Sequence, residues 1–142
     1  MQFWCKIYSF HREMLHSGYL NRGRRMLWRE DKEEKSGGKA LVDLGSHMID
    51  LVRFVLGDIE EINASSETVV RKGRSFEGRM VEVQVDDWAL PSSKISSDIK
   101  GSIEASRVVV GNEGARLSIY GDKGSLHLDL GNLLNALSDF SL

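Results

Sequence analysis

Residues 37–57 decide the fold, and they have the sequence GGKALVDLGSHMIDLVRFVLG. Apolar and small side chains fill nearly every position, which predicts a helix over residues 41–56 that lies in a core. Apart from Arg53, three ionisable groups interrupt this pattern within the helix: Asp43, His47 and Asp50. At about 100° per residue they fall within an arc of about 60° on the helix. The sequence therefore predicts one narrow polar seam on an otherwise apolar helix.

The polar seam admits three interpretations. Asp43 and His47 lie one turn apart, so both can contact one bound hydroxyl, and a neighbouring carboxylate fixes the imidazole tautomer, as in general acid/base catalysis. The ordinary alternative is a buried structural histidine bonded to the backbone, with the aspartates capping loops. Two carboxylates and an imidazole can also bind a metal, but no second ligand pair at metal spacing occurs, so we expect no metal site. The helix alone leaves the first two interpretations open.

Gly45 also bears on whether the polar seam is functional or structural. A glycine inside a helix costs roughly 1 kcal/mol relative to alanine. Its presence indicates either close approach of the backbone to a ligand or close packing of the helix on a sheet.

The residues after the helix predict an antiparallel sheet. Gly57 is a natural left-handed C-cap and ends the helix. Alternation of apolar and polar residues predicts strands, most regularly where three valines alternate with polar residues, and Gly121–Gly124 supplies the turn of a hairpin. The expected strands cover residues 59–70, 81–86, 99–110, 116–120 and 125–130. The fold class is therefore α+β, an open, mainly antiparallel sheet with a helix packed on one face.

The residues before the helix divide into a strand and a long loop. Alternation over residues 3–10 predicts a first strand, with Phe3, Cys5, Ile7 and Ser9 on one face. Residues 13–38 lack an apolar face and predict a loop, in which arginines surround Trp28 before an acidic run. Those arginines can contact a phosphate or a sugar acid, or they form a solvated, self-neutralising loop. His11 and His16 share no clear face, and we assign them no role.

Bulk composition excludes several classes of protein. The 142 residues carry a formal charge of −2 and suit one domain with a real core. This charge gives no field to attract nucleic acid or an anionic membrane, so we expect neither partner. Cys5 is the single cysteine, and the start resembles no secretory signal, so we expect a cytoplasmic location.

Several segments together resemble one family of NAD(P)-dependent oxidoreductases, Gfo/Idh/MocA, in its C-terminal domain only. Residues 37–50 are similar to that domain's glycine-rich start and its Asp-x-Gly-x-His-x-x-Asp pattern. Further similarity lies in KIYS at the entering strand, WR before the glycines, VDDWA in mid-sheet and IYGDKGSL at the late hairpin. The resemblance spans nearly the whole chain.

The resemblance implies a fold like the C-terminal domain of glyceraldehyde-3-phosphate dehydrogenase and a role in binding a sugar or polyol. It implies that His47 is the acid/base that takes a hydroxyl proton while hydride passes to a nicotinamide, and that Asp43 holds that hydroxyl. Asp50 matches a structural position. Trp28 and Lys39 are further candidates for substrate contact, because aromatic rings stack on sugars and Lys39 replaces the family's third glycine.

The cofactor implied by the family is NAD(P), but no Gly-x-Gly-x-x-Gly unit occurs in this sequence. We therefore expect residues 1–142 to form a single substrate-binding and oligomerisation domain, cut at both ends, without a Rossmann domain and inactive alone. Expected partners are a small sugar or polyol, a separate nucleotide-binding chain and a second copy that pairs through the sheet face. The alternative is a non-catalytic binding or dimerisation module derived from such an enzyme.

Overall fold

The computed structural model describes residues 6–21, 40–72, 74–76, 79–83, 85–96 and 98–131. Among these residues, no helix is long and apolar enough to cross a bilayer.

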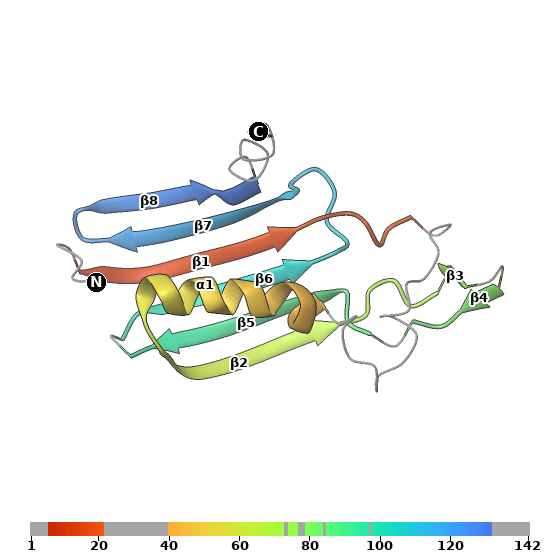
Figure 1. Cartoon of the computed structure of the whole chain (residues 1–142), viewed down its shortest axis with the longest axis horizontal. Helices are drawn as coiled ribbons and strands as arrows, with labels where there is room; N and C mark the ends of the chain where they lie inside the picture. The colour runs from red at the N-terminus through yellow and green to blue at the C-terminus, as the bar shows by residue number, and fades with distance from the viewer. Residues whose placement is uncertain are drawn as a thin grey trace, which may run out of the picture.

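One six-stranded sheet organises the chain, with strand order β2-β5-β6-β1-β7-β8 (Figure 1). β1 and β6 pair in parallel, and every other neighbouring pair is antiparallel. Two short strands, β3 and β4, form a separate hairpin at one end of the sheet. The strands are β1 (Ile7–Leu15), β2 (Ile59–Glu67), β3 (Arg74–Phe76), β4 (Arg79–Val81), β5 (Trp88–Ile95), β6 (Lys100–Ser106), β7 (Gly114–Gly121) and β8 (Gly124–Asp129).

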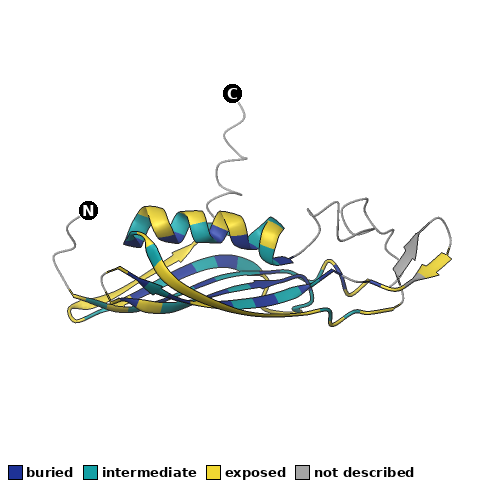
Figure 2. Cartoon of the chain, turned by 90° about the horizontal axis from the view of Figure 1, so that it is seen from below, coloured by how far each residue is buried: buried dark blue, intermediate teal, exposed yellow. Residues whose placement is uncertain are grey.

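A single helical segment covers one face of this sheet. It begins as a π-helical turn, η3 (Leu41–Gly45), and continues as α1 (Ser46–Leu56). Met48 and Val52 are fully buried toward the strands, and four-residue spacing places them on one side of the helix. Among the described residues, no helix covers the opposite face of the sheet (Figure 2).

The helix begins where it does because a distant aspartate binds its first amides. The Leu41 amide donates to Asp86 Oδ2 at 3.0 Å, and the Ala40 amide donates to the Asp86 carbonyl at 3.0 Å. A carboxylate at this end satisfies unpaired amides and complements the helix dipole. At the other end Gly57 has φ of 106° and ψ of −173°, and its amide donates to the Arg53 carbonyl at 3.0 Å. Its positive φ explains why glycine stands there, although its backbone is extended in ψ and is not the left-handed helical C-cap that we predicted.

The core lies between this helix and the central strands. Its members are apolar, and the strand members alternate along each strand, as one buried face of a sheet requires. The buried core residues are Phe10, Ala40, Met48, Val52, Leu56, Ile95, Ile99, Ile103, Ala105, Leu117 and Ile119.

The main predictions of the fold are confirmed. The helix over residues 41–56, the strand that begins at Ile59 and the hairpin with its turn at Gly121–Gly124 all occur. Together they give the predicted α+β class, a mostly antiparallel open sheet with a helix on one face. The parallel pairing of β1 with β6 was not predicted.

The first strand was placed too early. It covers Ile7–Leu15 and so occupies the start of the predicted loop, whereas Phe3 and Cys5 lie outside the described residues. The pairing register shifts between Ile7 and Ser9, which breaks the predicted alternation. The side chain buried beneath the helix is therefore Phe10.

The strand predicted over residues 81–86 was wrong. β4 ends at Val81, and Val83 and Val85 are buried within irregular backbone. The Val83 amide donates to the Arg71 carbonyl at 2.9 Å, and Asp86 binds the start of the helix. Since this segment bonds to two different parts of the chain, it does not follow one neighbouring strand.

The sequence prediction also lacked β5, which lies between β2 and β6. Pro91 interrupts this segment, and a proline argues against an interior strand because it has no amide to donate. The register between β5 and β6 passes from Ala89 to Ser92 without paired positions, so Pro91 lies at a gap in that ladder.

Candidate active site

The predicted polar seam separates into two environments on the helix. Asp43 lies in the π-helical turn η3, whereas His47 lies in the first turn of α1. A π-helical turn holds about one residue more than an α-helical turn, so it rotates Asp43 relative to the residues that follow. π-Helical turns inside helices occur frequently at functional sites.

Asp43 is held by a buried arginine. Arg107, which directly follows β6, forms an ion pair with Asp43 Oδ2 and donates a second hydrogen bond to the Tyr19 hydroxyl. The Arg107 side chain is 5% exposed and the Asp43 side chain 35% exposed. The guanidinium carbon also lies 4.7 Å from the centroid of the Tyr19 ring, within the range of a cation–π contact. The Asp43 carboxylate is therefore fixed in place at the edge of the buried region.

His47 is exposed on the outer face of α1. It lines a cavity of about 430 Å³ together with other residues of the same helix stripe. The spacing of three, four and seven residues from His47 is that of one helix face. The full lining is His47, Asp50, Leu51, Arg53, Phe54 and Asp58.

Two of the lining residues form an ion pair with each other. Arg53 Nη2 lies 2.9 Å from Asp58 Oδ1, and both side chains are more than half exposed. His47 therefore faces a shallow polar hollow in which these two charges are already paired.

The structure brings some predicted site residues together and separates others. His47 and Asp50 share the cavity, but Asp43 is not among its lining residues. Within the described part of the chain, no hydrogen bond or ion pair joins Asp43 to His47. The alternative of a buried structural histidine is wrong, because His47 is exposed. Trp28 and Lys39 lie outside the described residues.

Gly45 is explained by packing within the first turn. It is buried, and a Cβ atom at this position would lie 3.1 Å from Leu41 Cδ1. A larger side chain would push against Leu41 of the same helical turn, so this contact lies within the helix and decides neither for a ligand nor for packing on the sheet.

Sequence reasoning missed Arg107 and Asp86. Arg107 is 64 residues from its partner Asp43, and Asp86 is 45 residues from Leu41. Neither pairing has a periodic signature, because both join the helix to segments that border strands. The VDDWA segment at residues 85–89 marked Asp86 only by its resemblance to the family.

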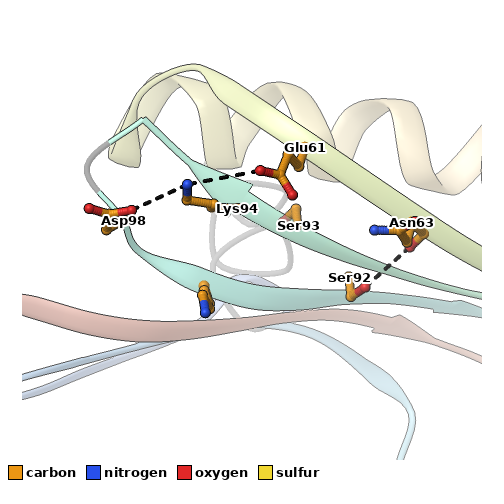
Figure 3. A pocket seen from close by; sticks show the side chains of 7 residues that line it. Glu61, Asn63, Ser92, Ser93, Lys94 and Asp98 are labelled. Carbon is orange, nitrogen blue, oxygen red and sulfur yellow. Dashed lines mark hydrogen bonds and ion pairs between the residues drawn. The ribbon is translucent and has the colours of Figure 1, made fainter.

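A second cavity lies on the other face of the sheet (Figure 3). It measures about 440 Å³ and is lined by Glu61, Asn63, Ser92, Ser93, Lys94, Asp98 and Lys100. The Lys94 ammonium lies 3.3 Å from Asp98 Oδ1, 3.5 Å from Glu60 and 3.9 Å from Glu61. The hydrogen bond that Lys94 donates to Asp98 and the charges of the nearby carboxylates raise the pKa of Lys94. The charge of this lysine is thus balanced locally, and the cavity lies away from His47.

Comparisons with known proteins identify relatives of this chain. An uncharacterized oxidoreductase of Synechocystis is 31% identical over 117 residues, which are 81% of this chain and 32% of that protein. The levoglucosan dehydrogenase of Pseudarthrobacter phenanthrenivorans is 27% identical over 135 residues, which are 85% of this chain and 34% of that enzyme. The chain thus spans about a third of the length of these relatives.

Solved structures match the same region. A levoglucosan dehydrogenase in complex with NADH and L-sorbose matches with a TM-score of 0.78 and 28% identity, covering 88% of this chain and 33% of that one. An NAD-binding oxidoreductase from Klebsiella pneumoniae matches with a TM-score of 0.79 and 31% identity, over 89% and 34%. The family model of the GFO/IDH/MocA C-terminal domain matches residues 6–127. The chain therefore belongs to the GFO/IDH/MocA C-terminal domain family.

Proposed function

We propose that this chain is the substrate-binding part of an NAD(P)-dependent dehydrogenase that acts on a sugar, polyol or related hydroxyl compound, with His47 as acid/base. The observation that carries this proposal is the exposed position of His47 over a cavity on the outer face of α1. An exposed imidazole that borders a hollow can exchange a proton with a bound hydroxyl.

In this proposal His47 and Asp43 have different tasks. A ring nitrogen of His47 accepts the hydroxyl proton of the substrate as the carbinol carbon loses hydride, so that a carbonyl forms. Asp43, held through Oδ2 by Arg107, offers Oδ1 to a substrate hydroxyl and positions it. Trp28 and Lys39 remain candidate substrate contacts, and Asp50 remains a structural position.

The residues that the structure describes do not fit a nicotinamide dinucleotide. In this family it supplies the hydride acceptor, but the described residues contain no parallel strand–helix–strand unit with a glycine-rich turn. We assign no step of dinucleotide binding to this chain. The nucleotide-binding part belongs to another segment or another chain in this proposal.

The outer face of α1 supports the presence of such a second body. Phe54 is 81% exposed and Val42 is 47% exposed, although both lie on the helix that carries the candidate site. A large apolar side chain that is exposed beside a polar cavity offers a contact point for another protein surface. We propose that the nucleotide-binding part covers this face and closes the His47 cavity.

A binding experiment tests the role of His47. The imidazole resonances of the chain are followed by nuclear magnetic resonance during titration with levoglucosan, L-sorbose and a polyol. We expect the His47 resonances to shift and saturate, and Asp43→Asn to weaken the binding. The resonances of His127, on the far face of the sheet, serve as the internal control. Unchanged His47 resonances at saturating sugar would contradict the proposed substrate class.

A fusion tests catalysis. Residues 6–127 replace the matching part of levoglucosan dehydrogenase, and NADH formation is measured. We expect His47→Gln to lower kcat by about 10²- to 10⁴-fold, the usual contribution of general acid/base catalysis. His127→Gln is the matched control and should leave kcat unchanged. If the two variants retain equal activity, His47 is not the acid/base.

The alternative of a binding or dimerisation module rests on the uncovered sheet face (Figure 2). In that case the chain pairs with a second copy through this face, and the helix seam binds no sugar. Analytical ultracentrifugation of the chain measures the pairing, and the titration above measures the binding. A stable homo-oligomer without sugar binding would favour the module.

The cytoplasmic location that we expect from the sequence stays a prediction.

A further inference from the structure

We propose that His11, Glu13 and Glu104 form a binding site for a divalent transition-metal ion on the face of the sheet opposite α1. One ring nitrogen of His11 and one oxygen of each carboxylate all lie within 4.8 Å of one another. An imidazole with two carboxylates is a ligand set that zinc accepts. No step of the proposed dehydrogenase function uses these three residues.

Strand pairing brings the three side chains together. β1 and β6 are parallel neighbours in register, and Glu13 is paired directly with Glu104. His11 precedes Glu13 by two residues, so the two side chains point to the same face of the sheet. That face is the one away from the helix, because Phe10 and Ile103, which alternate with these residues, belong to the core.

Each candidate ligand is oriented by a neighbour. The Ser102 hydroxyl lies 2.6 Å from His11 Nδ1, which leaves Nε2 directed at Glu13 Oε2, 3.3 Å away. Arg116 Nη1 donates to Glu13 Oε1 at 2.6 Å, and Trp88 Nε1 donates to Glu104 Oε1 at 3.0 Å. Metal ligands in proteins commonly carry such outer partners, which fix their rotamers and the imidazole tautomer.

The charge of the cluster can attract a divalent cation. Two carboxylates meet here, and Arg116 forms an ion pair with one of them, Glu13. The Glu13 side chain is only 15% exposed, so the solvent screens its charge incompletely. One metal ion can contact all three ligands at once. The His11 side chain is 37% exposed, which leaves a path for the ion from solvent.

The three ligand atoms must move slightly closer together to bind one zinc ion. Ligand atoms in a tetrahedral zinc site lie about 3.3 Å apart, given zinc–nitrogen and zinc–oxygen distances of about 2.0–2.1 Å. The present separations reach 4.8 Å at most, a difference that small rotations of the glutamate side chains remove. Three protein ligands then leave a coordination position for water or another small ligand.

Zinc titration of the full chain tests the proposal by isothermal titration calorimetry. Cys5→Ser is used as the background, because it removes the single thiol. We expect one zinc ion per chain and weaker binding at lower pH, since protons compete for the imidazole. His11→Ala and Glu104→Gln should each weaken binding at least about tenfold. His127→Ala is the matched control, because His127 lies on the same face with Ser118 Oγ 3.0 Å away, outside the cluster.

Trp88 fluorescence provides a second measurement of metal binding that does not depend on replacing a ligand, so it applies even if the ligand variants fail to fold. Trp88 bonds to the ligand Glu104, so copper ions at this site should quench its fluorescence in a chain that carries Trp4→Phe and Trp28→Phe. The proposal is overturned if the Cys5→Ser chain binds no zinc, if zinc competes poorly with magnesium, or if His127→Ala weakens binding as much as His11→Ala. Because this cluster lies across the sheet from His47, its failure leaves the proposed dehydrogenase function untouched.

Discussion

Arg107 is the residue on which the geometry of Asp43 depends. It is buried, whereas Arg53, which also pairs with an aspartate, is exposed. Loss of one partner of a buried pair leaves the other charge without compensation, while exposed pairs contribute little. We expect Arg107→Met to lower the free energy of unfolding by about 3 kcal/mol, near the lower end of this class because Asp43 is partly exposed. Urea denaturation measures the change.

The matched control is Arg53→Met, which breaks the exposed pair with Asp58. We expect this change to cost less than about 1 kcal/mol. Equal losses for the two variants would show that Arg107 is not buried in a paired state.

Lys94 gives the chain a pH dependence on its alkaline side. The neighbouring Asp98, Glu60 and Glu61 raise its pKa above the ordinary value of 10.5. A raised pKa in the folded state means that the stabilisation is complete below the ordinary value and is lost as pH rises through the raised value. We expect Lys94→Gln to lower Tm at neutral pH, with a difference that shrinks in alkaline buffer and in high salt.

Thermal unfolding at several pH values measures this difference. Lys72→Gln, another exposed lysine, is the control and should show no comparable pH-dependent difference. If the difference in Tm between wild type and Lys94→Gln stays constant across the alkaline range, the raised pKa of Lys94 does not stabilise the fold.

The candidate site was predictable only in part from single residues. Asp43 and His47 stood out because polar groups interrupted an apolar helix. Their separation was not predictable, because a uniform α-helix was assumed and the first turn is π-helical. Arg107 carried no local signal, since only the folded sheet brings it to the helix.

At the scale of elements, close packing of β1 on β6 depends on Gly101. Its pairing partner is Phe10, and a Cβ atom added to Gly101 would lie 2.4 Å from the Phe10 ring and from the Phe10 carbonyl oxygen. The ring therefore covers the glycine inside the core. We expect Gly101→Ala to lower the free energy of unfolding by about 3 kcal/mol, because neither the backbone nor the buried ring can move easily.

Gly111→Ala provides the comparison. Nothing lies within 4 Å of its added Cβ atom, and only its φ of 83° opposes a side chain. The expected cost is about 1 kcal/mol. Chemical denaturation measures the free energy of unfolding of both variants. A smaller loss of stability in Gly101→Ala than in Gly111→Ala would refute the close contact between Gly101 and Phe10.

Elements with regular alternation or a glycine turn were predictable, and the others were not. The β7–β8 hairpin is local, so its turn and its strands follow from neighbouring residues. β5 was not predicted because it contains Pro91. The missing amide of this proline is tolerated because Pro91 lies at a gap in the pairing between β5 and β6. Val83 and Val85 alternate like a strand, but their burial arises where irregular backbone crosses the end of the sheet.

At the scale of the whole molecule, the outer face of α1 presents one large apolar side chain to water. Phe54 is 81% exposed there. We expect Phe54→Lys to change the free energy of unfolding by less than about 0.5 kcal/mol, because almost no contact is lost. The same change should reduce self-association at high concentration, as measured by light scattering.

Val52→Lys is the contrasting change on the same helix. Val52 is fully buried, so a charge at this position should prevent folding. If Phe54→Lys also unfolds the chain, the outer face is not exposed as described.

The central position of β1 has a consequence for how the chain is made. β1 lies between β6 and β7, and His11 bonds to a residue 91 positions later. A ribosome adds about 5–20 residues per second, so β1 waits several seconds for either neighbour. Until then both of its edges offer unpaired amides and carbonyls to other nascent chains. The sheet closes only after β7 has been made, and chaperones that shield β1 until then should raise the yield of folded protein.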